Sequence, residues 1–250
     1  MINSKLKKSV FICFGVIIAS CGIGCGKSNE MELPINKVSE IYTSYDYPVA
    51  MSLSEMSDSA ELVVVGKYTG MDSTWNMARN PDNVAEEDEE NYTEGRLYNF
   101  SISELWKGKV DTDSILVNHR YLQVVNEVET NAVVDRSGVI RKEATKENKL
   151  ALTIHDPLFI EPVIDETYVL FLRKDQDMGN YYGAMEPFSI KISNGVAELQ
   201  SNLIGQSGVS QEDISVDGGR TVKANVEMGT SIADTISGMN LDDIKHIVTQ

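Results

Sequence analysis

An acidic run in the first half of the sequence carries the side chains best suited to metal chemistry. Six carboxylates fall close together, and calcium is a hard cation that prefers several oxygen ligands. They are Asp82, Glu86, Glu87, Asp88, Glu89 and Glu90. The run lacks the spacing and the glycine of a calcium-binding loop, and like charges in a row are typical of a solvated segment. We therefore predict no metal cofactor and expect divalent ions to screen these charges nonspecifically. If the segment does bind calcium, these six carboxylates are the candidate ligands.

The three histidines do not predict a zinc site, because His119, His155 and His246 lie far apart in the sequence. His155-Asp156 could act as an acid-base pair in a hydrolase, although a histidine before Asp-Pro more often forms a turn with a hydrogen-bonded ring. No serine-nucleophile signature accompanies it. We predict no enzymatic activity and no cofactor. An envelope hydrolase or metal-dependent enzyme that uses His155, Asp156 and the acidic run is the alternative.

Two aromatic residues beside the acidic run are candidates for ligand binding. Trp75 and Tyr92 lie in an expected insertion, whereas most other aromatic residues fall on expected strands, where core packing is the usual role. Exposed rings could stack on a sugar or contact a peptide. The chain has 38 acidic against 22 basic residues, and this excess opposes binding to nucleic acid. The expected partner is therefore an envelope protein, a peptide or a glycan.

The N-terminus has the composition of a secretory signal. Three lysines precede an apolar run over residues 9–19, which is too short to span a bilayer. Residues 18–21, Ile-Ala-Ser-Cys, resemble the lipobox of bacterial lipoproteins. The resemblance implies removal of residues 1–20, a diacylglycerol on the Cys21 thiol, and often a further acyl chain such as palmitate on the freed amine. Two or three chains would anchor the protein on the outer face of the cell membrane, or on the outer membrane in a host with two membranes.

A plain signal peptide cleaved elsewhere and an uncleaved N-terminal anchor are the alternatives. Cys25 is a poorer acceptor because Gly22 stands where an aliphatic residue is expected. Cys13 would leave with the leader and the Cys21 thiol would carry lipid, so Cys25 would be the remaining thiol and no intramolecular disulfide would be available to the mature chain. Cleavage also removes three lysines and no acids, which changes the net charge from -16 to -19. We expect residues 21–48 to form a flexible tether, partly ordered near residues 42–47.

From residue 49 onward the patterns predict many short strands. A β-branched run within residues 61–68 ends in glycine and predicts a buried strand, and the alternation of apolar and polar residues over 97–106 predicts a second strand. Asn194-Gly195 is a two-residue hairpin signal. Further strands are expected at 114–117, 150–154, 167–172, 181–192 and 196–199. Long insertions are expected at about 71–94 and 126–148, and a loose segment is expected at 201–229, which is rich in Gly, Ser and Asp.

Two short helices complete the prediction. Ser52 and Glu55 have the spacing of a capping box, which predicts a helix through Asp58. Asn240 precedes residues 241–248, whose acids in the first turn and apolar stripe predict an amphipathic helix that docks on the barrel. The expected fold class is mainly β with minor α. We predict a single domain over residues 49–250, built as a small antiparallel OB-like barrel with two long insertions.

Several of these patterns, in this order, resemble a widespread class of exported bacterial domains. They are Ser52-x-x-Glu55, Glu61-Leu62-Val63-Val64-Val65-Gly66-Lys67, Tyr98-x-Phe100-x-Ile102-x-x-Leu105-Trp106-Lys107-Gly108 and Glu166-x-Tyr168-Val169-Leu170-Phe171-Leu172. Those domains are similar to the OB-type barrels of netrin modules and of the tissue inhibitors of metalloproteinases. The resemblance covers roughly residues 52–199. Because its motifs describe a core, it implies a fold and no chemistry.

The resemblance does not carry over the inhibitory mechanism. In those inhibitors a free N-terminal cysteine, locked by disulfides, reaches the protease metal, whereas Cys21 is expected to be acylated here. The expected function is therefore that of a lipid-anchored, noncatalytic binding module of the bacterial envelope. A protease-inhibitor-like domain is the remaining alternative.

Overall fold

The computed structural model describes residues 37–45, 47–134, 136, 139–144, 147–206, 208–216 and 219–250. The proposed signal, Cys21 and most of the expected tether lie outside these residues. The chain divides into two compact units. Among the described residues, the smaller unit contains Lys37 and those within 128–149, and the larger one contains those within 38–127 and 150–250, so β4 and β7 each contribute to both.

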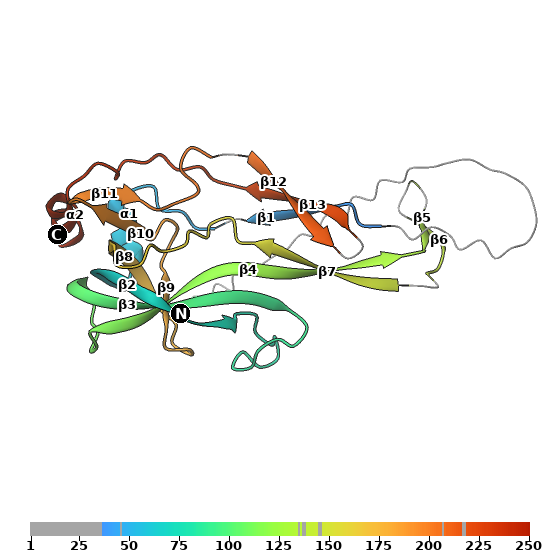
Figure 1. Ribbon diagram of the computed structural model, residues 1–250, viewed down its shortest axis with the longest axis horizontal. Coiled ribbons are helices and arrows are strands. Elements are labelled where there is room, and N and C mark those ends of the chain that lie inside the picture. The colour runs from blue at the N-terminus through green and yellow to red at the C-terminus, as the bar shows by residue number, and fades with distance from the viewer. Residues whose placement is uncertain are drawn as a thin grey trace, which may run out of the picture. The chain divides into compact units, whose positions relative to one another are not determined.

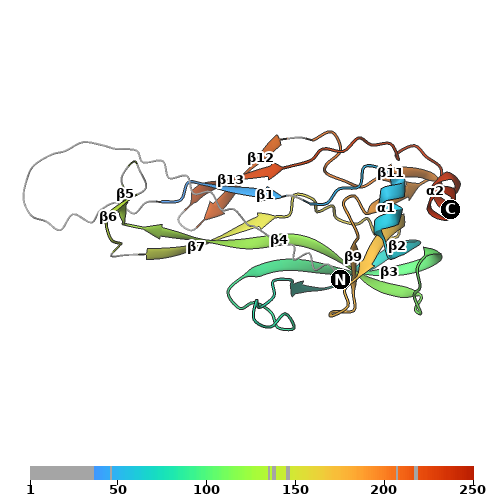
Figure 2. The same ribbon diagram turned by 180° about the vertical axis from the view of Figure 1, so that it is seen from behind.

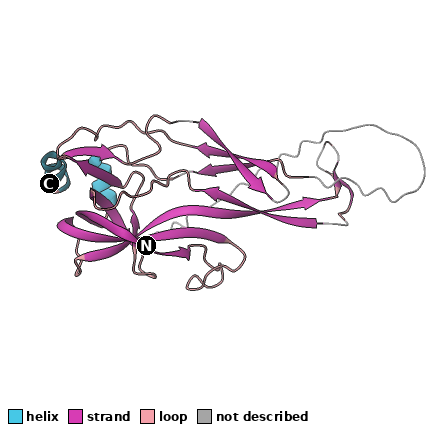
Figure 3. Ribbon diagram, in the orientation of Figure 1, coloured by secondary structure: helices cyan, strands magenta, loops and turns pink. Residues whose placement is uncertain are grey.

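Strands dominate the described part of the chain, as Figure 3 shows. In chain order the elements are β1 (Glu40–Tyr45), α1 (Leu53–Ser59), β2 (Leu62–Asn76), β3 (Tyr92–Lys107), β4 (Ser114–Thr130), β5 (Val133–Val134), β6 (Ile140–Lys142), β7 (Glu147–His155), β8 (Thr167–Lys174), β9 (Tyr181–Gly183), β10 (Ser189–Ser193), β11 (Val196–Leu199), β12 (Gly208–Val216), β13 (Arg220–Met228) and α2 (Leu241–Val248). In the smaller unit β5 pairs antiparallel with β6. The site discussed below lies in the larger unit.

Five strands of the larger unit pair in a closed ring. β2, β3 and β4 form an antiparallel meander, and β8 pairs with the other edge of β2. The short strand β9 closes the ring, because it pairs in parallel with β4 and antiparallel with β8. A small five-stranded barrel with this Greek-key connection is the OB-type architecture. The expected fold class is thus confirmed: mainly β, with an OB-like ring inside an eight-stranded sheet that also contains β7, β10 and β11 (Figure 1).

The two faces of β2 and β8 pack into different cores. Tyr68, Leu170 and Leu172 join a cluster inside the ring with Tyr98 and Phe100. The alternate residues pack outward against the two helices and the β10–β11 hairpin; among them are Val63, Val65, Val169 and Phe171. Burial on both faces explains why the sequence of β8 is an almost continuous apolar run.

The helices begin where their capping signals predict. Ser52 Oγ accepts a hydrogen bond from Glu55 N at 3.2 Å, and Asn240 Oδ1 accepts one from Asp243 N at 2.9 Å. α2 buries Ile244 and Val248 against the outer core, beside α1 (Figure 2). Among the described residues no helix has both the length and the apolar content needed to cross a bilayer.

A second sheet, of order β1-β13-β12, was not predicted from the sequence. The expectation of a loose segment at 201–229 is wrong. Val222, Ala224 and Val226 alternate into a core that also contains Leu152 and Ile154 of β7, so the β12–β13 hairpin buries one face. The glycine and serine residues of the segment made the alternation of apolar and polar residues difficult to recognise in the sequence.

Three expected boundaries differ from those of the structure. β1 pairs in parallel with β13 within the expected tether 21–48, so the chain enters the fold at Glu40. β2 and β3 pair well into the expected insertion 71–94, which leaves residues 77–91 as the connecting loop. β4 extends to Thr130 in the second insertion, 126–148, which also contains β5 and β6.

Candidate functional site

The loop of residues 77–91, which we call the acidic loop, is fixed at its base by one buried asparagine. Asn76 Nδ2 donates to the carbonyl oxygens of Asp88 and Asn91, both at 3.0 Å. Its Oδ1 accepts from the backbone N–H groups of Ala78 and Thr93, also at 3.0 Å. All the hydrogen-bonding capacity of this amide is therefore used in holding the two ends of the loop together.

Trp75 is held rigidly at the start of the acidic loop. Its indole Nε1 donates to Asn118 Oδ1 on β4 at 2.9 Å, and the guanidinium carbon of Arg79 lies 4.6 Å from the centre of its ring. Gly95 lies opposite Trp75 on β3. A Cβ at Gly95 would collide with both Trp75 Nε1 and Asn118 Oδ1, so the close approach of these side chains requires glycine.

The acidic loop meets the loop that joins β8 to β9, residues 175–180. Arg79 Nη2 lies 3.8 Å from the sulfur of Met178, whose side chain is exposed. Asp175 Oδ1 orders the second loop by accepting from the backbone N–H groups of Asp177 and Met178. The acidic loop follows the first strand of the ring, and the loop of residues 175–180 joins its last two strands. In OB-type barrels, loops in these two positions flank the ligand-binding face.

The carboxylates of the acidic loop divide into one structural group and five exposed ones. Asp88 Oδ1 accepts from the backbone N–H of Glu90 at 2.8 Å, and Asp88 Oδ2 accepts from Asn91 Nδ2 at 2.7 Å. The Asn91 hydrogen bond is the main reason why the pKa of Asp88 is lowered. The other five side chains face solvent and have no ion pair in the described structure: Asp82, Glu86, Glu87, Glu89 and Glu90. In the part of the chain that the structure describes, no three His, Cys, Asp or Glu side chains gather as a metal site requires.

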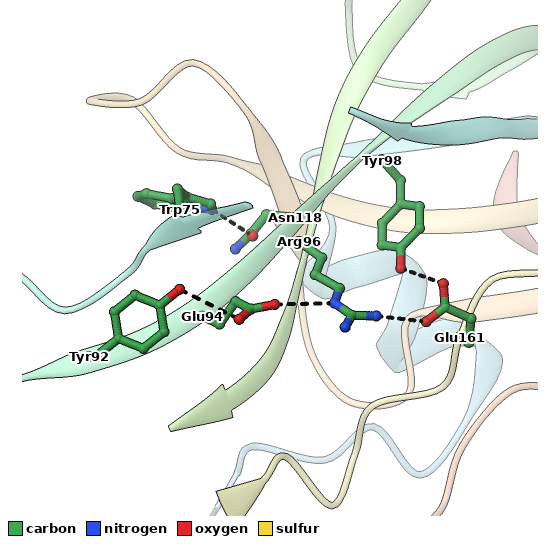
Figure 4. A network of polar contacts seen from close by, with 7 residues as sticks. All are labelled: Trp75, Tyr92, Glu94, Arg96, Tyr98, Asn118 and Glu161. Carbon is green, nitrogen blue, oxygen red and sulfur yellow. Dashed lines mark hydrogen bonds and ion pairs between the residues drawn. The ribbon is translucent and has the colours of Figure 1, made fainter. Parts of the chain in front are cut away.

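Tyr92 lies at the start of a polar network along β3 (Figure 4). Its hydroxyl donates to Glu94 Oε2 at 3.5 Å, and Glu94 Oε1 pairs with Arg96 Nε at 3.3 Å. Arg96 Nη1 reaches Glu161 Oε2 at 3.1 Å, and the hydroxyl of Tyr98 donates to Glu161 Oε1 at 2.6 Å. Tyr92 remains 38% exposed, so it is available to a ligand.

His155 and Asp156 do not form a dyad. Asp156 Oδ2 pairs with Arg120 Nε at 3.1 Å, and its Oδ1 accepts from Leu158 N at 2.8 Å. Burial raises the pKa of Asp156 against the opposing effect of these contacts. The ring of His155 instead packs edge-on against Tyr121, with 5.0 Å between ring centres. Both residues line a polar hollow of about 370 Å³, but the contacts of Asp156 give it a structural role.

Sequence reasoning missed a small cleft of about 30 Å³ in the larger unit. Its walls include Glu186 and His119. Burial raises the pKa of the Glu186 carboxyl group to about 7. Burial lowers the pKa of the His119 imidazole to about 4, so this ring is neutral at physiological pH. No motif signals either residue, because β4, which carries His119, and the β9–β10 connection, which carries Glu186, are distant in sequence. Arg79, Asn118 and Met178 were missed for the same reason.

Comparison of the chain with protein-family models, with curated proteins and with solved structures gave no match.

Proposed function

We propose that this protein is an exported, lipid-anchored, noncatalytic binding module that captures a basic protein or peptide on the paired loops 77–91 and 175–180. The lipobox-like residues 18–21 support anchoring through Cys21 on the outer face of the membrane. The candidate site supports binding, because its ordered loops present exposed side chains and no reactive constellation.

The observation that carries the choice of partner is the set of five exposed carboxylates beside the fixed Trp75. Their negative field attracts cations and is not cancelled by ion pairs within the described structure. Arg79 lies over the Trp75 ring, which disfavours stacking of a sugar on that face. A basic polypeptide can instead pair with the carboxylates while its apolar groups contact Met178 and Tyr92.

Metabolic labelling with an alkyne analogue of palmitate tests the anchor. We expect label on the wild-type protein and none on Cys21→Ala, with Cys25→Ala labelled as wild type. The Cys21→Ala protein should also leave the membrane fraction. Equal labelling of the wild type and Cys21→Ala would contradict the proposed acceptor.

Site-specific photo-crosslinking in cells tests the binding surface. A photoreactive residue at Glu89 should capture a defined basic protein, and the same residue at exposed Glu227 on β13 should not. Replacing Glu86, Glu87, Glu89 and Glu90 by glutamine, with the crosslinker moved to Asn83, should abolish capture. An unchanged product from the four-residue variant would show that the carboxylates do not recognise the partner.

A further inference from the structure

The small cleft introduced above shares no residue with the two loops of the proposed binding surface. Three of its residues lie on segments remote in sequence: Glu161 before β8, Glu186 before β10, and Gln200 after β11. Tyr68, His119, Leu158, Ile160, Pro162, Tyr168, Phe188 and Ser189 complete the lining. The lining thus combines two carboxylates with aromatic rings and contains no lysine or arginine.

Glu186 is partly buried, and its carboxyl group has no basic partner in the described structure. Its Oε1 accepts a hydrogen bond from Ser201 Oγ at 2.8 Å. The backbone around it is fixed, because Glu186 N donates to the Pro48 carbonyl and its own carbonyl accepts from Ala50 N. Burial raises the pKa of this carboxyl group, and the nearby charge of Asp156 raises it further. Burying the charged form of this carboxyl group costs free energy, and no basic side chain of the described structure offsets that cost. A cation placed beside the carboxylate would offset it.

The remaining walls are compatible with a cation. Tyr68 shares a 2.9 Å hydrogen bond with His119 Nε2, and the hydroxyl of Tyr168 accepts from Val163 N at 3.0 Å. Both tyrosines line the cleft, and aromatic rings attract a positive charge that lies over their faces. His119 is neutral at physiological pH and does not repel one. Glu161 also lines the cleft, but its charge is paired with Arg96, so Glu186 is the carboxyl group of this lining that has no basic partner in the described structure.

We propose that this cleft binds a primary ammonium group, supplied by a lysine side chain of a partner. The group would contact Glu186 and Gln200 and lie against the aromatic rings. A volume of about 30 Å³ holds one or two water-sized groups, which suits an ammonium and excludes the broader guanidinium of arginine. The inference does not depend on the acidic loop, since the cleft has its own residues.

Saturation-transfer NMR on the full mature chain in detergent tests the proposal, with Nα-acetyl-lysine methylamide as the probe. We expect saturable binding, at least fivefold weaker binding of the matching arginine compound, and at least fivefold weaker lysine binding by Glu186→Gln. Glu227→Gln is the matched control, because it removes the same charge from an exposed position on β13 and should bind as wild type. Circular dichroism establishes that both variants are folded.

Three results would overturn the proposal. Equal losses in Glu186→Gln and Glu227→Gln would indicate attraction by the net charge alone. Equal affinity for the lysine and arginine compounds would remove the size argument. Displacement of the lysine compound by millimolar calcium but not by millimolar choline would assign the cleft to a metal ion. The quadruple glutamine variant of the acidic loop should still bind the lysine compound. The experiment can therefore contradict partner binding on the acidic loop without contradicting ammonium binding in the cleft, and the reverse.

Discussion

At the scale of single residues, His119 and Glu186 in the small cleft have pKa values that burial shifts in opposite directions. The pKa of His119 is lowered to about 4 and that of Glu186 is raised to about 7, in both cases first by burial. Between about pH 4 and pH 7 both side chains therefore favour their neutral forms in the fold: His119 is deprotonated and Glu186 is protonated. These opposite shifts give the two residues opposite effects on the pH dependence of stability.

Glu186→Gln should stabilise the protein at alkaline pH. The folded carboxyl group holds its proton to about pH 7, whereas the unfolded one releases it near pH 4.5, so wild-type stability should fall as the pH rises through this window. The variant removes that loss, and we expect it to be more stable by on the order of 2 kcal/mol at pH 8 and nearly equal at pH 4. Urea unfolding at both pH values measures this. A difference independent of pH would contradict the assignment.

Gly95→Ala should disturb the candidate site directly. The added methyl group collides with Trp75 and Asn118, and overpacking of this kind costs about 1 to 3 kcal/mol. In a Trp106→Phe background, where Trp75 is the remaining tryptophan, we expect a red shift of the fluorescence as its hydrogen bond to Asn118 is lost. Ser101→Ala, at an exposed position on the same strand, is the control. An unshifted spectrum would show that β3 accommodates the methyl group elsewhere.

At the scale of elements, short local sequence patterns correctly predicted a hairpin turn and the starts of both helices. Asn194 and Gly195 adopt φ of 53° and 78° in the β10–β11 turn, and the capping residues of both helices accept the expected hydrogen bonds. The closure of the ring was harder to predict, because β9 pairs with β4 across more than sixty residues. β1 and β13 were missed because parallel pairing between the two ends of the chain leaves no local signal.

The candidate site was predicted only in its parts. Composition singled out Trp75, Tyr92 and the acidic run, which the structure places in or beside one loop. It could not show that Asn76 orders that loop, or that Asn118 and Gly95 position Trp75, since these contacts depend on the β2–β3–β4 register. The expectation of a merely solvated segment therefore overlooked the ordered base of the loop.

The docking of α2 provides a test at this scale. Ile244 is fully buried in the outer core, and Ile247 on the same helix is 40% exposed. Ile244→Ala should destabilise the protein by about 2 to 4 kcal/mol, because it leaves a cavity. Ile247→Ala should cost much less, since the removed atoms are partly in water. Urea unfolding of both variants makes the comparison, and similar losses would mean that α2 packs through a different face.

At the scale of the whole molecule, charge is the dominant property. Without residues 1–20 the chain has 38 acidic and 19 basic residues, and this imbalance disfavours the compact state by self-repulsion. We expect the melting temperature of the mature protein to rise between 10 mM and 200 mM sodium chloride, because salt screens the repulsion. Choline chloride should act equally, which separates screening from specific ion binding. A melting temperature that falls over this range would contradict the expectation.

The parallel pairing of β1 with β13 has a mechanical consequence. Six consecutive residue pairs join the two strands, from Glu40 with Lys223 to Tyr45 with Met228. The hydroxyl of Tyr45 then accepts a hydrogen bond from Gln123 on β4. A pull along the axis of β1 from its N-terminal end would load these hydrogen bonds together in shear, so that none opens alone. In a protein anchored through Cys21, tension on the anchor would reach the fold through β1, where the hydrogen bonds to β13 would share the load.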